Sequence, residues 1–178
     1  MRILQVITDT DRRGAQVFAT DLGTALSKMG HEIETVALAP GATSPPLEVE
    51  VLGPTQRTAT SLRTLRRKMK AVDVTIAHGS STGLACALAG LGHGRPFVYR
   101  QISDTRFWAN SLSRRLRVAT YLRQARRIVA LSDGAKADLV AHLRLPAKSI
   151  TVVPNGVPVR EYRCPSDDER ADAPRGPS

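Results

Sequence analysis

The fold is decided by residues 3–38, which read ILQVITDTDRRGAQVFATDLGTALSKMGHEIETVAL. Residues 3–8 are a short apolar run rich in β-branched side chains, which predicts a strand. A helix is expected over residues 14–29, where Gly30 ends it, and residues 32–38 predict a second strand. The residues expected on the buried face of this helix are Val17, Phe18, Leu22, Ala25, Leu26 and Met29. A strand, a helix and a strand in this order form a right-handed crossover with parallel strands.

The same alternation continues along the chain. Further strands are expected at residues 47–52, 73–78, 96–101, 128–131 and 150–153. Further helices are expected at residues 61–71, 81–91 and 111–125, and from Ser132 to just before Pro146. This pattern predicts an α/β fold with a doubly wound parallel sheet, in a single Rossmann-like domain over residues 1–162. Residues 163–178 lack apolar periodicity and predict a linker or a disordered tail.

Composition and charge narrow the class of protein. Of the 178 residues 42% are apolar and 24% charged, which excludes a chain that is disordered throughout. The 26 Lys and Arg against 16 Asp and Glu give a net charge of +10, so an anionic partner is expected. The opening apolar run is broken by Gln5 and Asp9 and is too short for a signal peptide, which predicts a cytoplasmic protein. Cys86 and Cys164 lie in unlike surroundings, which argues against a disulfide framework or a metal site.

Two predicted helices carry most of the positive charge, and each has an apolar stripe expected to face inward. The basic residues of the helix at 61–71 are Arg63, Arg66, Arg67, Lys68 and Lys70. Those at the helix at 111–125 and directly after it are Arg114, Arg115, Arg117, Arg123, Arg126 and Arg127. The expected inward residues are Leu62, Leu65 and Met69, and Leu112, Leu116, Ala119 and Leu122. Such faces are solvated by default, and they can also dock on anionic lipid headgroups at the inner membrane face. Nucleic acid is not an expected partner, because no aromatic side chains are interleaved with the arginines.

Parallel sheets of this kind bind ligands beyond the carboxyl ends of strands, where the strand order reverses, so the loops after the first and fourth strands are candidate sites. In the first loop, Arg13 and Gly14 come directly before a helix N-terminus, where free N–H groups favour an anion. The spaced glycines of a dinucleotide fingerprint are missing, which disfavours NAD. Alternatively, Gly14 only begins the helix, and Arg12 and Arg13 are solvated.

The second loop contains His78, Ser80 and Ser81, which can hydrogen-bond sugar hydroxyls or a phosphate. The alternative is a structural histidine with one of the serines as a helix N-cap. The same residues form a G-x-S-x-G pattern around Ser81, which is typical of a serine hydrolase. That second alternative lacks a suitable base, because His93 is too close in sequence and His142 is predicted inside a helix.

The segment after the fifth strand, residues 103–110, contains the only tryptophan. An aromatic face stacks on sugar C–H groups, so Trp108 with Asp104 and Arg106 is a candidate acceptor platform. Alternatively, Phe107 and Trp108 pack beneath the helix that follows.

Several segments in this order resemble the N-terminal domain of a glycosyltransferase family 4 enzyme with the GT-B fold, over nearly all of residues 1–162. They are the Gly14-Ala15-Gln16 loop, LSKMGHEI at 26–33, DVTIAH at 73–78, ALSD at 130–133 and ITVVPNGV at 150–157. The resemblance implies transfer of a sugar from a nucleotide-sugar donor to a sugar or lipid-linked acceptor. It also implies retention of configuration, with no bound metal ion and no cofactor besides the nucleotide-sugar substrate.

By this resemblance, Arg13 and Gly14 lie near the donor diphosphate, and His78 matches a family histidine and is the candidate catalytic residue. The candidate acceptor residues are Ser80, Ser81, Asp104, Arg106 and Trp108. Another histidine, common after the fifth strand in the family, is replaced here by Ile102-Ser103. The family's second, donor-binding domain is expected to begin where this sequence ends, so we expect a truncated first domain that is inactive or weak alone. The remaining alternative is a non-catalytic binding module.

Overall fold

The computed structural model describes residues 1–92, 94, 96–104 and 110–156. Its strands are β1 (Arg2–Ile7), β2 (Glu32–Ala37), β3 (Glu50–Val51), β4 (Val74–His78), β5 (Phe97–Arg100), β6 (Arg127–Ala130) and β7 (Ile150–Val152). Its helices are α1 (Gly14–Lys28), α2 (Ala59–Ala71), α3 (Ser80–Gly90), α5 (Leu112–Leu122) and α6 (Asp133–Leu143), with a short 3-10 helix at Ala147–Ser149. The expected tail at residues 163–178 lies outside the described residues.

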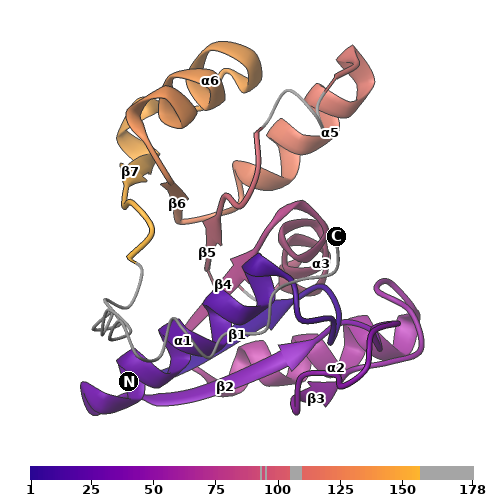
Figure 1. Ribbon diagram of the computed structural model, residues 1–178. Helices are drawn as coiled ribbons and strands as arrows, with labels where there is room; N and C mark the ends of the chain where they lie inside the picture. Colours follow the sequence, from indigo (N-terminus) through magenta and orange to yellow (C-terminus); the bar gives the residue numbers. More distant parts are fainter. Residues whose placement is uncertain (93, 95, 105–109, 157–178) are drawn as a thin grey trace, which may run out of the picture.

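The strands form one seven-stranded sheet in the order β3-β2-β1-β4-β5-β6-β7. Every neighbouring pair is parallel. The order reverses between β1 and β4, which lie side by side in the middle of the sheet (Figure 1). This arrangement confirms the predicted α/β fold with a doubly wound parallel sheet, and it places the loops after β1 and β4 at the same edge.

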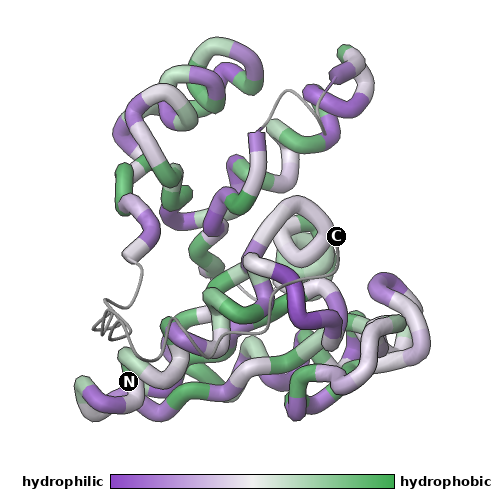
Figure 2. The backbone as a smooth tube through the Cα atoms, in the orientation of Figure 1, coloured by the Kyte–Doolittle hydropathy of each residue, from purple (hydrophilic) through white to green (hydrophobic). Residues whose placement is uncertain are grey.

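Helices cover the two faces of the sheet unequally. The larger apolar core joins the strands to α2, α3, α5 and α6, and its fully buried side chains include Leu4, Leu65, Met69, Tyr99, Ile128 and Leu139. A much smaller core lies on the face covered by α1 and consists of Ile7, Ala19, Ala37 and Leu47. Successive strand residues point to opposite faces, so Leu4 and Ile7 of β1 serve different cores. Helices α5 and α6 alternate hydrophilic and hydrophobic residues along their length, as helices with one buried face do, whereas α3 has no charged residue (Figure 2).

Helix α1 faces the sheet with other residues than its apolar spacing predicts. The residues buried in α1 are Gln16, Ala19 and Gly23, whereas Met29 is 71% exposed. A Cβ on Gly23 would lie 2.8 Å from Gln5 Nε2, so glycine at this position permits close approach of helix and sheet. The helix therefore presents Val17 and Phe18 to one side, where they line a pocket.

Helix α5 also differs from its predicted inward stripe. Its buried residues are Val118, Ala119, Tyr121 and Leu122, all in its second half. Leu112 is 72% exposed and Leu116 is 61% exposed, so the prediction was wrong for these two residues. Only the C-terminal half of α5 packs against the core. The two leucines of the first half are therefore exposed, and they lie among arginines.

Strand β3 is much shorter than the predicted 47–52, and only Glu50 and Val51 pair with β2. Leu47 instead donates its backbone N–H to Thr10 O at 2.8 Å and belongs to the small core beneath α1. Lys68 of α2 stabilises the pairing of β2 with β3 through two ion pairs. Its Nζ lies 2.5 Å from Glu34 Oε1 of β2 and 2.7 Å from Glu50 Oε2 of β3.

Candidate functional site

The loop after β1 is organised by ion pairs of Arg13. Its guanidinium contacts the carboxylate of Asp9 and lies 3.2 Å from Asp11 Oδ2. The hydrogen bond from Arg13 to Asp9 raises the pKa of the arginine. Asp11 also accepts hydrogen bonds from the backbone of Ala42 and Thr43, and the bond from Thr43 is the main cause that lowers the pKa of this carboxyl. The positive charge of Arg13 is thus balanced by two carboxylates, and its contact with a donor phosphate stays a prediction.

Gly14 opens α1 and faces free space. A Cβ built on Gly14 would meet no described atom within 4 Å. The N-cap residue Arg13 makes no side-chain capping bond, and the first turn of α1 contains no acidic residue. The backbone N–H groups of Gln16 and Val17 donate to Arg13 O, so those of Gly14 and Ala15 are the ones that can face an anion at this helix N-terminus.

His78 ends β4 beneath α1 and is only 1% exposed. Its Nε2 lies 2.9 Å from Gln5 Oε1, and Gln5 in turn donates from Nε2 to Ala19 O at 2.9 Å. Burial, together with the nearby charge of Arg100, lowers the pKa of His78 to about 3, so the ring is neutral near pH 7. Because Gln5 offers its carbonyl oxygen, the histidine proton lies on Nε2, and Nδ1 has no hydrogen-bond partner among the described residues. The catalytic role of His78 stays a prediction.

Ser80 and Ser81 are the first residues of α3, and neither is its N-cap. That position is taken by Gly79, whose φ of 96° is one that residues with a Cβ rarely adopt. A Cβ on Gly79 would also lie 2.6 Å from Ile102 Cδ1, so the loop after β4 packs on the segment after β5. Within the described residues Ser81 has no hydrogen bond to a histidine, and His142 lies 3.6 Å from Asp138 of its own helix. The geometry does not favour the serine hydrolase; His93 lies outside the described residues.

Arg100 is a feature of this edge that the sequence analysis missed. It ends β5 beside His78, and its residue is only 6% exposed. Its Cζ lies 3.6 Å from the centroid of the Phe18 ring, and its Nη2 donates to Asn155 Oδ1 at 2.5 Å. Burial lowers the pKa of Arg100 to about 10, which leaves the guanidinium charged at neutral pH. The signal in the sequence is an arginine that ends an otherwise apolar strand, FVYR, at its carboxyl end.

A pocket of about 400 Å³ joins the start of α1 to the ends of β5 and β7. It is lined by Gly14, Ala15, Val17, Phe18, Asp21, Arg100, Ile102, Asn155 and Gly156. The sequence analysis named the loops after β1 and β4 as the candidate sites. Among the described residues the second wall comes instead from β5 and β7, because Ile102 packs against Gly79 and separates the loop after β4 from the pocket.

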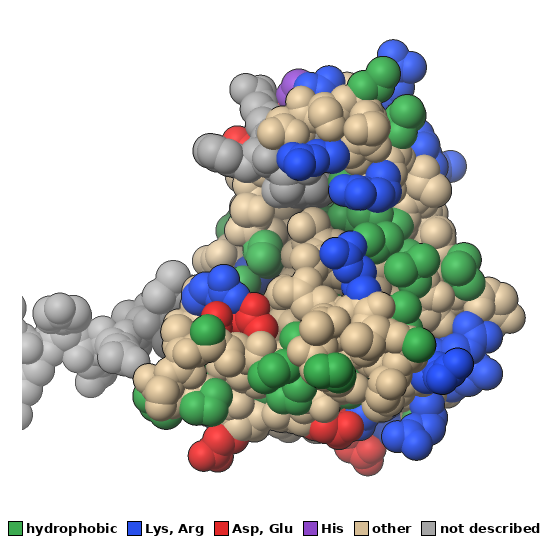
Figure 3. Space-filling model, turned by 90° about the vertical axis from the view of Figure 1, so that its right-hand side faces the viewer, with side chains coloured by type: hydrophobic (Ala, Val, Ile, Leu, Met, Phe, Trp, Pro, Cys, Tyr) green, Lys and Arg blue, Asp and Glu red, His purple; other side chains and the backbone are tan. Residues whose placement is uncertain are grey.

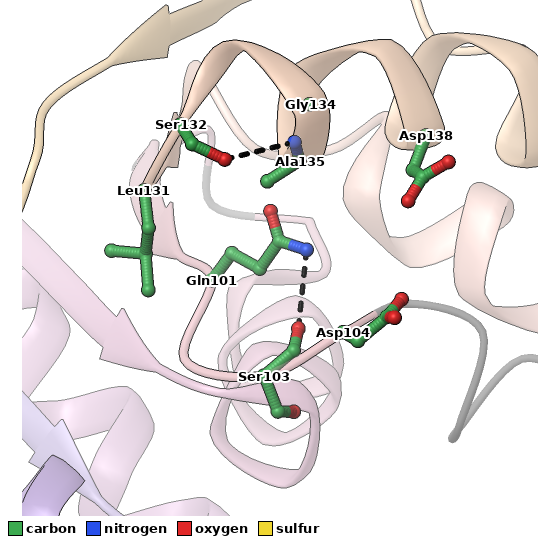
Figure 4. A pocket seen from close by; sticks show the side chains of 8 residues that line it. All are labelled: Gln101, Ser103, Asp104, Leu131, Ser132, Gly134, Ala135 and Asp138. Atoms are coloured by element: carbon green, nitrogen blue, oxygen red, sulfur yellow. Dashed lines mark hydrogen bonds between the residues drawn. The ribbon is translucent and has the colours of Figure 1, made fainter.

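Asp104 lines a different pocket, of about 380 Å³, between the segment after β5 and α6 (Figure 4). In it Gln101 Nε2 donates to Ser103 O at 3.1 Å, and Ser132 caps α6 by accepting from Ala135 N at 3.1 Å. Residues of one segment alternate between the pockets, Arg100 and Ile102 in the first, Gln101 and Ser103 in this one. The structure thus separates Asp104 from Gly14, and Arg106 and Trp108 lie outside the described residues.

The described part of the chain has neither a cluster of metal-ligating side chains nor a membrane-spanning helix. There, no three His, Cys, Asp or Glu side chains gather as a metal site. None of the helices described is both long and apolar enough to cross a bilayer. Cys86 is buried and unpaired, and burial raises the pKa of its thiol.

A doubly wound parallel sheet with an open helix N-terminus at its reversal point is the architecture of the first half of a GT-B protein. The sequence profile of Glycosyltransferase Family 4 matches residues 12–161. The chain belongs to this glycosyltransferase family. A comparison with curated protein sequences finds no match.

Solved structures with the same fold include HepE of Anabaena in complex with UDP-glucose, with a TM-score of 0.72 and 19% identity, over 88% of this chain and 44% of HepE. Sucrose-phosphate synthase of Thermosynechococcus elongatus has a TM-score of 0.65 and 13% identity, over 88% of this chain and 48% of the synthase. UDP-N-acetylglucosamine 2-epimerase of Rickettsia bellii has a TM-score of 0.59 and 12% identity, over 85% of this chain and 44% of the epimerase. This chain therefore spans less than half the length of each of these three proteins.

Proposed function

We propose that this chain is the acceptor-side half of a glycosyltransferase that transfers a sugar from a nucleotide-sugar donor, with retention of configuration and without a metal ion. The observation that carries the proposal is the pocket at the start of α1, where Gly14 leaves the helix N-terminus open beside the cationic Arg100. The family match and the binding of UDP-glucose by HepE support a nucleotide sugar as the donor.

In this proposal the donor diphosphate lies at the first turn of α1, and Gly14 allows its close approach. Arg13 keeps the loop in place through its ion pairs with Asp9 and Asp11, beside the proposed position of the diphosphate. His78, at the end of β4, keeps the catalytic role that the resemblance implies, and the acceptor is bound by Ser80, Ser81, Asp104, Arg106 and Trp108. The ribose and the remaining donor contacts come from a second domain, so we expect this chain alone to be weak or inactive.

The test measures release of nucleoside diphosphate from a panel of nucleotide sugars. The chain is assayed alone and together with a donor-binding domain of the family, with a set of sugar and lipid-linked acceptors. We expect turnover only with both halves present, and the Gly14→Val variant should lose most of it. Turnover at ordinary enzyme rates by the chain alone would contradict the proposal that a second domain is needed to bind the donor. Cleavage of a small ester that depends on Ser81 would favour the hydrolase instead.

A second element of the proposal is contact with an anionic membrane through the first half of α5. There Leu112 and Leu116 are exposed among Arg114, Arg115 and Arg117. Lys and Arg side chains gather on the same side of the molecule as patches of exposed hydrophobic side chains (Figure 3). Exposed leucines beside arginines suit the boundary between acidic headgroups and acyl chains, which is where a lipid-linked acceptor lies.

A further inference from the structure

Arg100 connects three elements that are far apart in the sequence. It is the last residue of β5, its Cζ lies 3.6 Å from the centroid of the Phe18 ring on α1, and its Nη2 donates to Asn155 Oδ1 at 2.5 Å. Arg100 is buried, and no carboxylate of a described residue forms an ion pair with it. One buried side chain therefore links β5, α1 and the segment after β7.

The charge of Arg100 is not explained by the stability of the sheet. A buried guanidinium without an ion-pair partner is destabilising, whereas an apolar side chain of similar length would fill the same space. The guanidinium differs from such a side chain in its geometry, because its planar face stacks on an aromatic ring while its edge donates a hydrogen bond. Arg100 therefore fixes Asn155 relative to Phe18 in distance and in direction.

The segment that contains Asn155 is attached to the rest of the molecule mainly by this bond. The backbone hydrogen bonds of the sheet reach as far as Val153, whose N–H donates to Ala130 O at 2.9 Å. Beyond Val153, the backbone forms no further hydrogen bond within the part of the chain that the structure describes. The side chain of Arg100 therefore determines where Asn155 lies.

The residues that Arg100 connects belong to different walls of the pocket at the start of α1. Gly14 and Phe18 lie on the wall formed by α1, and Asn155 and Gly156 lie on the wall formed by the segment after β7. Arg100 lines the same pocket and contacts both walls. The width of the pocket between α1 and the segment after β7 therefore depends on this arginine.

We infer that Arg100 is a positioning residue, which holds the segment after β7 at a fixed distance from α1. The family match ends at residue 161, so a second half that follows the matched region is reached through this segment. By holding Asn155, Arg100 fixes both the width of the pocket and the direction in which the chain leaves the first half. Only the effect on catalysis rests on the proposed sugar transfer.

The first test measures the backbone order of Asn155 and Gly156 by ¹⁵N relaxation in the whole 178-residue chain. Arg100→Met keeps the length of the side chain and removes the fork, whereas Asn155→Ala removes only the acceptor. We expect an order parameter of about 0.8 for both residues in the natural chain, typical of a rigid backbone. In either variant it should fall below about 0.6, the range of a flexible segment.

A double variant and a matched control separate this role from a general loss of structure. If Arg100 acts through Asn155, the double variant Arg100→Met with Asn155→Ala is no more mobile after β7 than either single variant. Arg63→Met removes an exposed arginine from α2, which packs on the opposite face of the sheet from α1. This control should leave the order of Gly156 unchanged.

Two conservative variants test the geometry of the bond. Asn155→Asp keeps an acceptor oxygen for the guanidinium, so it should keep the natural order after β7. Arg100→Lys keeps the charge without the planar fork, so it should lose that order. If Arg100→Met does not fold, Asn155→Ala and Asn155→Asp still decide the question, because Asn155 is exposed and its substitution leaves the core intact.

The second test uses the turnover assay with an added donor-binding domain. We expect kcat to fall by about tenfold in Arg100→Met and in Asn155→Ala alike, because the alignment of the reacting groups is lost. KM for the nucleotide sugar should change by less than about threefold, since the loss concerns alignment and not binding. A loss of activity in Arg100→Met that Asn155→Ala does not share would overturn the inference, because Arg100 would then act on the ligand directly.

The two tests fail independently of each other. Asn155 and Gly156 that stay rigid in a folded Arg100→Met chain overturn the positioning role, whatever the turnover assay gives. Increased mobility in both single variants, together with no turnover of any nucleotide sugar by the natural chain, supports the positioning role and contradicts only the proposed function.

Discussion

At the residue scale, the environment of His78 is set by a side chain from another strand. Gln5 lies on β1, is fully buried, and holds the histidine Nε2 at 2.9 Å. The same amide ties β1 to α1 through Ala19 O. The histidine is therefore fixed as the neutral tautomer with its proton on Nε2, a state that no inspection of the local GSSTG segment can reveal.

The first prediction concerns the pH dependence of stability. The pKa of His78 is lowered from 6.5 to about 3 in the folded chain, so below pH 6.5 the unfolded chain binds a proton that the folded chain does not. Stability from this residue is complete above about pH 6.5 and is lost as the pH falls towards 3. Between about pH 7 and pH 5 the free energy of unfolding should fall by about 2 kcal/mol on this account.

Urea unfolding of the natural chain and of His78→Gln at these two pH values measures the effect. The glutamine variant should lack this component, whereas His142→Gln, altered at a partly exposed position of α6, should keep it. Equal pH dependence in the natural chain and the His78→Gln variant would show that the histidine is not buried in its neutral form.

The second prediction compares two glycines. Gly14→Ala adds a methyl group in open space at a helix start, and it should leave the melting temperature unchanged or raise it slightly. Gly83→Ala places a Cβ 2.9 Å from the ring of Tyr99 inside the core, and overpacking should cost about 1–3 kcal/mol. Thermal unfolding of both variants checks this, and a Gly14→Ala variant as unstable as Gly83→Ala would show that the α1 start is not open.

At the element scale, α5 combines a buried half with an exposed half. The third prediction is that Leu112→Ser with Leu116→Ser removes binding to vesicles that contain acidic lipid and barely changes stability, because both leucines are more than half exposed. Leu122→Ala is the contrasting variant, since this leucine is 1% exposed and its truncation should cost about 2–5 kcal/mol. Sedimentation with vesicles of acidic and of neutral lipid measures the first effect. Equal binding to both kinds of vesicle, or none by the natural chain, would argue against the docking role of α5.

The positions of the elements could be predicted from the sequence better than their buried faces. The β-α-β pattern of residues 3–38 fixes a parallel crossover, because periodicity is a local property of the chain. The face of α1 was predicted wrongly, since Gly23 and Gln16 pack on the sheet through contacts with Gln5 and Asp9 that periodicity does not contain. Arg100 was missed for a related reason, as its role depends on Phe18 and Asn155 from distant parts of the chain.

At the scale of the whole molecule, the described residues form one half of the architecture found in larger proteins. The fourth prediction is that a chelator such as EDTA changes neither the melting temperature of the chain nor the turnover of the complete enzyme. Its basis is the proposed metal-independent transfer, and the described residues contain no cluster of three metal-ligating side chains. A loss of turnover on chelation that added Mg²⁺ or Mn²⁺ restores would contradict the proposal.

The segment from Arg100 to Asp104 lies between two pockets of the molecule. Arg100 and Ile102 line the pocket beside α1, whereas Gln101, Ser103 and Asp104 line the pocket beside α6. Because the same backbone segment lines both pockets, a shift of this segment that changes the volume of one pocket also changes the volume of the other. Substitutions in this segment that enlarge one pocket should therefore narrow the other. Variants selected to bind a new ligand in one pocket are expected to change the ligand selectivity of both pockets.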